Sequence, residues 1–440
     1  MPEISILILM LLWLVSFLGI SAFVMRIFQL KSETAPLVAL SFLSVGLNLF
    51  GMIGWLQTAA FAFYLTGLAF FAYTAFKQKR SFLKLLLSPV SVVCLIWIVY
   101  LIVRLRNYLP YENDDLSHWA LAAREILRTN AYPDASCEIL SFSAYPLSSA
   151  VNIYYFCRFI GNHEWLYAFA QAFYRLIAFL PLLSLVRKNR VFGYVSFALG
   201  FLFISRAGGY IASLRVDPLL TAYGIGAFAA VLSSDTKKSR TLIALLPLMI
   251  MQTLTKNSGI FFAVTQALAL ALMVSKQSGK HQGLRAFLIG SGASAASLGI
   301  WLFYVSCVFS SGLSTKHAVS LSAYIHNALD KGLETTLKIA RAFFGALCTP
   351  LPSDLMIYAL FALALAFMGL MIRAFHKQKL VRPLLEMLGF LASVYVCYLL
   401  FLFGMYIVSM PEKEALAAAS FTRYHRTITL YMGGCALAFV

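Results

Sequence analysis

The chain has 440 residues, of which 61% are hydrophobic and 12% are charged, and its mean hydropathy is +0.82. This composition excludes a soluble globular protein and is typical of polytopic membrane proteins. The formal net charge of +18 would suit a nucleic acid partner. The basic residues, however, concentrate in short loops between apolar segments, so we expect no nucleic acid to bind.

Spans of roughly 20 apolar residues recur along the chain. They predict an all-α, polytopic transmembrane helical bundle, one domain over 1–440, with about 12–13 spans at 4–25, 35–57, 58–76, 85–103, 165–186, 191–205, 217–233, 241–254, 260–275, 286–309, 353–374, 384–409 and 427–440. Residues 4–25 lack a small-residue cleavage site and predict a first span, with no removable signal peptide. The last span is short, so we expect the sequence to be truncated at Val440.

The charges of the loops predict the orientation of the chain. If segment 77–84 is cytoplasmic, every other short basic loop falls on the same side, and together these loops hold 19 Lys and Arg but only two acids. Cytoplasmic loops carry an excess of Lys and Arg. We therefore expect 104–164, 310–352 and 410–426 on the non-cytoplasmic face of the plasma membrane, with anionic lipid as a minor partner.

The first long outer loop contains an unusual cluster of acids. The chain has only 17 Asp and Glu, yet three of them and a histidine fall within seven positions, in Glu112-Asn113-Asp114-Asp115-Leu116-Ser117-His118. Acids beside a bilayer must be held by partners, a substrate or a metal, so we expect a functional site. Adjacent carboxylates repel, so the pKa of one of them should rise unless a cation is near.

Each residue of this cluster has more than one interpretation. Asp115 is suited to cap a helix that starts at Leu116, and one cap needs only one carboxylate. Asp114 is therefore the better candidate for a general base or a metal ligand. His118, one turn further on, could assist catalysis or bind a metal, or it could be a plain surface histidine.

Amphipathic helices are predicted in the outer loops. One runs over 116–128, with His118 on its polar face, and a second starts at Tyr145-Pro146. Their aromatic apolar faces predict that both lie on the membrane surface. A third segment, 321–347, has the same helical spacing at Leu321, Ile325, Leu329, Leu333, Leu337 and Phe344.

Three predicted spans, 191–205, 241–254 and 260–275, are shorter than a bilayer requires. The shortfall surrounds the polar breaks 206–209 and 253–259, which both fall on the outer side. Irregular backbone at membrane depth is tolerated only where it is buried in protein or lines a watery cavity. We therefore expect an outward-facing polar cavity.

Basic residues gather on the same side as this cavity. Lys256 lies between two apolar spans and either snorkels to the interface or serves the cavity. Because cations bind a lipid-linked phosphate, the candidate phosphate-binding residues are Lys256, Arg423, Arg215 and Arg426. Asp217 is predicted to be the ion-pair partner of Arg215. Cys137 and Cys348 both fall in outer loops, and the sequence leaves open whether they pair.

Several segments together resemble the GT-C glycosyltransferases, which include protein O-mannosyltransferases and the transferase that adds aminoarabinose to lipid A. The segments that carry the resemblance to bacterial, cell-envelope relatives of this group are Asp114-Asp115-Leu116-Ser117-His118-Trp119, Tyr145-Pro146, Leu254-Thr255-Lys256-Asn257-Ser258-Gly259 and Ser420-Phe421-Thr422-Arg423-Tyr424. The resemblance implies that Asp114 acts as the base, with Asp115 as its partner or as a ligand of a divalent metal. GT-C enzymes usually place these acids after the first span, whereas about four spans precede them here.

We therefore expect an inverting membrane glycosyltransferase of the hexosyltransferase type. It would transfer a sugar from a polyprenyl-phosphate donor to a hydroxyl of a glycan, lipid or protein acceptor. Two alternatives stay open. One is a surface-polysaccharide polymerase or ligase, which typically uses a lipid diphosphate. The other is a transporter or flippase of lipid-linked sugar, for which internal two-fold repeats and a midplane charge pair are expected and are not found in the sequence.

Overall fold

The computed structural model describes residues 2–77, 89–137, 144–185, 211–235, 239–309, 321–351 and 381–439, with single positions at 140, 142, 197, 354, 355, 358, 359, 362, 366 and 373. Within these residues all regular structure is helical, as predicted. The chain divides into two compact units, Met1–Gly312 and Leu313–Val440.

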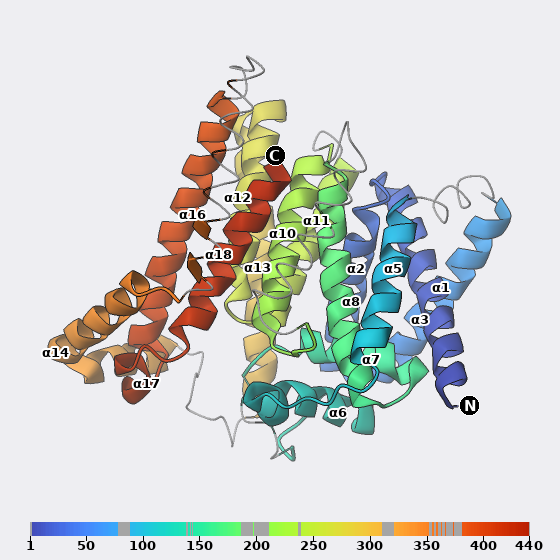
Figure 1. Ribbon diagram of the computed structural model, residues 1–440, viewed down its shortest axis with the longest axis horizontal. Coiled ribbons are helices and arrows are strands. Elements are labelled where there is room, and N and C mark those ends of the chain that lie inside the picture. Colours follow the sequence, from blue (N-terminus) through green and yellow to red (C-terminus); the bar gives the residue numbers. More distant parts are fainter. Residues whose placement is uncertain are drawn as a thin grey trace. The chain divides into compact units, whose positions relative to one another are not determined.

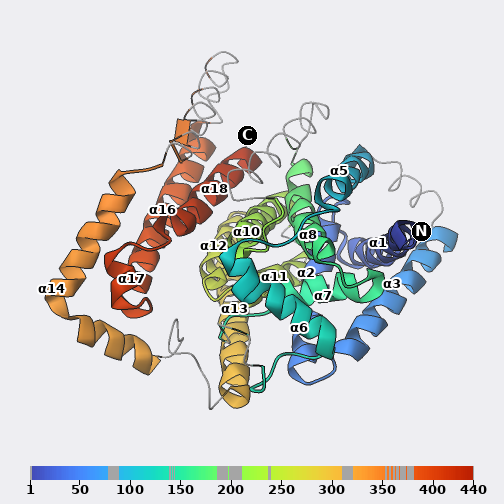
Figure 2. The same ribbon diagram turned by 60° about the horizontal axis from the view of Figure 1, so that its bottom comes forward.

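The first unit is a bundle of long helices, and two shorter helices, α6 and α7, lie at one end of it (Figures 1 and 2). Its elements are α1 (Pro2–Phe28), α2 (Ala35–Met52), α3 (Leu56–Lys77), α5 (Pro89–Leu105), the π-helix η1 (Asp115–Trp119), α6 (Ala120–Thr129), α7 (Ser148–Ile160), α8 (Glu164–Leu183), α10 (Val216–Ser233), α11 (Ser239–Thr255), α12 (Gly259–Ser278) and α13 (Lys280–Val308).

Eight helices in the described residues are long and apolar enough to cross a membrane, and two shorter helices, Val90–Leu105 and Arg240–Thr255, are apolar as well. The chain is therefore a multi-pass membrane protein. The predicted span 191–205 and most of 353–374 lie outside the described residues. The prediction of a shortened span at 260–275 is wrong, because α12 continues through the polar residues Lys276 and Gln277 to Ser278.

The centre of the first unit is formed by α8 and α10, which are buried along most of their length. Small residues let the two backbones approach closely, and Gly226 of α10 packs directly on the carbonyl of Ala178 in α8. By contrast, most of the side chains of α3 and α13 face outward. The unit therefore has a packed interior and an apolar surface suited to lipid.

Helix α7 belongs to the bundle, so the prediction that it lies on the membrane surface is wrong. Almost all of its residues are buried, on every side of the helix. Trp13 of α1 donates its indole N–H to the carbonyl of Tyr155, and its ring packs edge-on against Tyr155 and Phe156. The aromatic face of α7 is thus covered by protein rather than by lipid.

The two ends of the first unit carry different loops. At one end Lys31 donates to the carbonyl of Ser184 after α8, and Thr34 contacts Ser233 at the end of α10. We call this the basic end, defined by residues 26–34, 184–185, 233–235, 239–240 and 276–285. The opposite end, at the bottom in Figure 1, is the acid end, defined by residues 106–119, 211–217 and 255–259.

The second unit contains α14 (Leu321–Cys348), α16 (Val381–Val408), α17 (Glu412–Leu416) and α18 (Phe421–Phe439). The helix predicted over 321–347 is confirmed as α14, with an exposed apolar stripe at Ile325, Leu329, Leu333, Leu337 and Phe344. Gly332 breaks its helical geometry with φ 62°. Just before this break, Lys331 donates to the carbonyls of Tyr406, Ile407 and Met410, and so satisfies the C-terminal end of α16.

Candidate functional site

The acids of the first loop are held by a second segment, residues 211–217, which leads into α10. The hydroxyl of Ser213 donates to Glu112 over 2.8 Å, and the backbone N–H of Leu214 donates to Asp115 over 3.0 Å. The guanidinium of Arg215 lies 2.9 Å from Glu112 and 3.6 Å from Asp114. Three consecutive residues of the 211–217 segment thus each contact an acid of the cluster.

Two polar residues of α8 hold the 211–217 segment from the other side. Gln171 donates to the carbonyls of Ser213 and Arg215, and Arg175 donates to the carbonyls of Ile211 and Ser213. These bonds satisfy backbone groups of an irregular segment buried inside the bundle. The sequence prediction missed both residues. A glutamine and an arginine one turn apart in an otherwise apolar span were the available signal.

Asp115 is fully buried, which makes it a weaker acid than an exposed aspartate. Burial raises the pKa of Asp115 to about 6, although the N–H of Leu214 and the charges of Arg215 and Arg175 oppose the rise. Its second oxygen, Oδ1, has no hydrogen-bond partner among the described residues. The predicted helix cap is wrong. Asp115 lies inside a π-helix, and its carboxylate bonds to a residue far away in sequence.

Asp114, the neighbouring acid, has different surroundings. Its side chain is 40% exposed, and Arg215 is the cation beside it. The prediction was that the pKa of one carboxylate rises unless a cation is near; here Arg215 is near, and burial nevertheless raises the pKa of Asp115. Of the two adjacent carboxylates, Asp114 is the one that a substrate can reach.

His118 is buried, so its interpretation as a surface histidine and its place on a polar helix face are both wrong. Its ring packs against Trp119, Phe142 and Tyr145, at centroid distances of 4.5, 5.6 and 5.6 Å. Neither ring nitrogen has a hydrogen-bond partner in the described part of the chain. Burial lowers the pKa of His118 to about 4, against the opposing charge of Asp114, so the imidazole is neutral at pH 7.

Two motifs named from the sequence, Tyr145-Pro146 and the segment 254–259, lie close to each other in this part of the structure. The ring of Tyr145, from the predicted Tyr145-Pro146 motif, stacks on Trp119 at 6.0 Å. The carbonyl of the preceding residue, Ala144, accepts hydrogen bonds from Asn257 and from Trp301 of α13. The break between α11 and α12 therefore lies next to the same part of the first loop.

Lys256, in that break, forms an ion pair with Asp217 at 2.5 Å, and both side chains are mostly buried. The predicted pairing of Asp217 with Arg215 is therefore wrong, since Arg215 turns toward Glu112 and Asp114. The structure places Lys256 at the acid end as predicted. Its charge is met by Asp217, which anchors the beginning of α10 to the beginning of α12.

Arg423 and Arg426 belong to the second unit. Arg426 pairs with Asp354 at 2.9 Å, and the guanidinium of Arg423 lies 4.9 Å from the centre of the Tyr424 ring. Between them His425 is buried and lies 2.8 Å from the hydroxyl of Tyr395. The second unit thus has its own buried polar cluster, of which the sequence prediction named only the two arginines.

The acid cluster does not fit a metal site. Among the described residues no group of three His, Cys, Asp or Glu side chains could hold a metal ion. One oxygen of Asp115 is taken by the N–H of Leu214, and the guanidinium of Arg215 lies beside both Glu112 and Asp114. Cys137 belongs to the first unit and Cys348 to the second, so their pairing stays an open question of the sequence.

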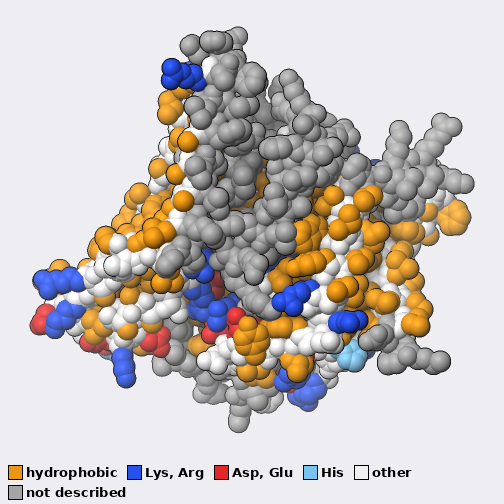
Figure 3. All heavy atoms as spheres, in the orientation of Figure 1, with side chains coloured by type: hydrophobic (Ala, Val, Ile, Leu, Met, Phe, Trp, Pro, Cys, Tyr) orange, Lys and Arg blue, Asp and Glu red, His pale blue; other side chains and the backbone are white. Residues whose placement is uncertain are grey.

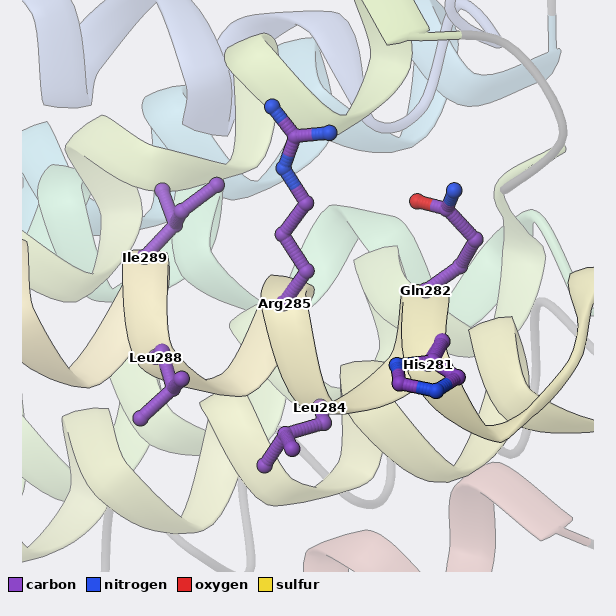
Figure 4. Close-up of a pocket in the computed structure, with 6 residues that line it drawn as sticks. All are labelled: His281, Gln282, Leu284, Arg285, Leu288 and Ile289. Carbon is purple, nitrogen blue, oxygen red and sulfur yellow. The ribbon is translucent and has the colours of Figure 1, made fainter.

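Two pockets of the first unit lie outside the acid cluster. One, of about 670 Å³, is lined only by α13, with residues His281, Gln282, Leu284, Arg285, Leu288 and Ile289 (Figure 4). A single helix supplies this lining near the basic end, so the pocket is an exposed helix face. A second hollow, of about 340 Å³, is lined by Val103–Tyr108 at the acid end of α5.

The acid end therefore brings together an accessible carboxylate, a buried carboxylate, a neutral histidine and two ion-paired cations from segments far apart in the chain. These are the chemical groups on which any function at this end must depend. Comparisons of the chain with protein-family models, with curated proteins and with solved structures find no match.

Proposed function

We propose that the protein is a membrane glycosyltransferase that transfers a sugar from a polyprenyl phosphate to an acceptor hydroxyl. The observation that supports this most is the accessible carboxylate of Asp114 beside the guanidinium of Arg215, at the end of a membrane bundle opposite its basic loops. A base and a cation side by side suit a reaction in which a hydroxyl loses a proton and a phosphate leaves.

Each residue has a defined part in the proposed reaction. Asp114 accepts the proton of the acceptor hydroxyl while the hydroxyl oxygen attacks the anomeric carbon of the donor. The bond from that carbon to the phosphate oxygen breaks, its electron pair leaves on the phosphate, and the configuration inverts. Arg215 stabilises the negative charge of the departing phosphate.

The remaining candidates support this pair. Asp115 and the 211–217 segment hold Asp114 and Arg215 next to each other, and Lys256 fixes Asp217 at the start of α10. His118 is neutral and buried, which suits support of the aromatic cluster better than proton transfer. Arg423 and Arg426 stay candidate phosphate-binding residues of the second unit.

The proposal includes an orientation. The described loops of the basic end carry Lys and Arg, which membrane insertion retains on the cytoplasmic side. The acid end then faces the non-cytoplasmic side of the plasma membrane, where lipid-linked sugars serve as donors. This orientation and the resemblance of segments 114–119 and 254–259 to GT-C enzymes both favour a polyprenyl-phosphate donor.

The test is transfer from radiolabelled polyprenyl-phosphate hexoses in membranes that contain the full chain. Asp114→Asn should reduce transfer at least roughly 100-fold, because a positioned base contributes about that much or more. Asp134→Asn is the matched control. Asp134 lies in the same loop, is exposed and bonds only locally to Ser136.

The same assay separates the rival functions. Full activity of Asp114→Asn would remove this residue as the base. Transfer only from a lipid diphosphate would favour a polymerase or ligase. Movement of the intact lipid-linked sugar across proteoliposomes, without cleavage, would favour a transporter.

A further inference from the structure

The acid end of α5 carries two exposed arginines next to a hollow. The hollow of about 340 Å³ is lined by Val103, Arg104, Leu105, Arg106, Asn107 and Tyr108, two of them cations and none an acid. Arg104 and Arg106 are both exposed. After α5 the chain turns tightly, with the N–H of Tyr108 bonded to the carbonyl of Leu105. The end of α5 therefore presents two positive charges beside the hollow.

An apolar track leads along α5 to this hollow. The exposed side chains of the helix follow one face with helical spacing, and they are Val92, Leu95, Ile96, Val99, Tyr100 and Val103. At a rise of 1.5 Å per residue the track is about 17 Å long. Figure 3 shows hydrophobic side chains along α5 and basic side chains at its lower end.

The hollow is close to the acid cluster in the chain and in space. Helix α5 packs on α8, which carries Gln171 and Arg175. The ring of Tyr108 contacts that of Tyr111, next to Glu112. A phosphate held at the hollow would therefore be near the carboxylates.

We propose that this part of α5 binds the phosphate end of a polyprenyl phosphate. Arg104 and Arg106 bind the phosphate, and the prenyl chain runs along the apolar track from Val103 toward Val92. Guanidinium groups suit this ligand because they form charge-assisted hydrogen bonds to phosphate oxygens. The identification of this lipid as the sugar donor rests on the proposed function, whereas the binding site itself does not.

The site has two parts, the arginines at the hollow and the apolar track. A polyprenyl phosphate occupies both parts, which free phosphate and bulk phospholipid do not. The apolar track gives no hold to a free phosphate. A phospholipid has two acyl chains, whereas the track is one helix face wide. The site therefore fits a single chain with a terminal phosphate.

The test measures binding of a long-chain polyprenyl phosphate to the purified full chain in phosphatidylcholine nanodiscs, by native mass spectrometry. The double variant Arg104→Gln/Arg106→Gln should bind this lipid at least roughly tenfold more weakly. The matched control is Arg124→Gln/Arg128→Gln, which removes two exposed arginines from α6 and should leave binding unchanged. Polyprenol, inorganic phosphate and phosphatidylglycerol are the competitors, and each should displace the probe poorly.

A second measurement does not depend on the folding of variants. A polyprenyl phosphate with a photoreactive group in its chain should crosslink to peptides of residues 89–108 in the unaltered protein. Crosslinking elsewhere, equal binding by the double variant, or equal competition by phosphatidylglycerol would overturn the site. If binding behaves as expected and no sugar is transferred, the proposed function fails while the site stands. Sugar transfer with an unchanged KM in the double variant would instead overturn the site while the proposed function stands.

Discussion

The two ends of the first unit use charge in different ways. At the acid end, Asp115 is buried and accepts a hydrogen bond from Leu214, and the buried Asp217 pairs with Lys256 of another segment. At the basic end, residues such as His281 and Arg285 are exposed on α13. At the basic end it is the total number of Lys and Arg residues that matters, because this number sets the orientation of the chain in the membrane. At the acid end it is the position of each buried charged group that matters, so single substitutions should reduce stability much more there.

The largest expected effect comes from Arg175→Leu. This change removes the hydrogen bonds from Arg175 to the carbonyls of Ile211 and Ser213 and a buried cation near Asp115, so the protein should lose about 3–5 kcal/mol of stability. Thermal unfolding of the purified protein in detergent measures the loss. Arg285→Leu, at the exposed basic end, should change stability by less than about 0.5 kcal/mol. Equal losses of stability in the two variants would mean that the two ends do not differ in how they use charged residues.

A somewhat smaller effect is expected from Lys256→Met. The change removes the ammonium group that pairs with the buried Asp217 and should cost about 3 kcal/mol. Adding Asp217→Asn should restore more than half of that loss, because the desolvated carboxylate is then gone as well. The four melting curves of this double-mutant cycle give the coupling energy. A coupling near zero would show that the pair does not hold α10 to α12.

The smallest expected effect is a pH dependence in which Asp115 and His118 oppose each other. The raised pKa of Asp115 means that the folded state binds its proton more tightly, so this group adds stability as the pH falls from about 6 to about 4. The lowered pKa of His118 means that the folded state resists its proton, so this group removes stability as the pH falls from about 6.5 to about 4.

Because both shifts span about two pH units, each contributes about 2–3 kcal/mol and the two nearly cancel. Melting temperature measured between pH 7 and pH 4.5 checks this. Asp115→Asn should lose stability on acidification more steeply than the unaltered protein, whereas His118→Phe should gain stability. Parallel profiles for all three proteins would mean that neither group has a shifted pKa in solution.

The sequence predicted the helical bundle well because apolar length is a local property. The helices α2, α8 and α10 begin within a residue of the predicted spans, and the acid-rich loop was recognised from its composition alone. Even so, α7 was placed on the membrane surface because a pattern of aromatic residues cannot distinguish lipid from protein as the covering surface. The contact with Trp13 decides that question.

The site was harder to predict because its contacts are tertiary. Nothing near Asp115 in the sequence indicates a bond to Leu214, and nothing near Asp217 indicates Lys256 as its partner. The burial of His118 depends on Phe142 and Tyr145, which follow a helix and a turn later. Arg175 could have been found, since an arginine inside an apolar span needs a partner wherever it lies.

The π-helix Asp115–Trp119 has a consequence for how this loop tolerates insertions and deletions. A π-turn holds one residue more than an α-turn, so it shifts the rotational phase between what precedes it and α6. Deleting one residue, such as Leu116, which is 49% exposed, would restore an ordinary α-turn. The chain before it would then rotate by about 100° relative to α6. The helix would survive, but Asp114 would no longer be at the surface with Asp115 in the interior.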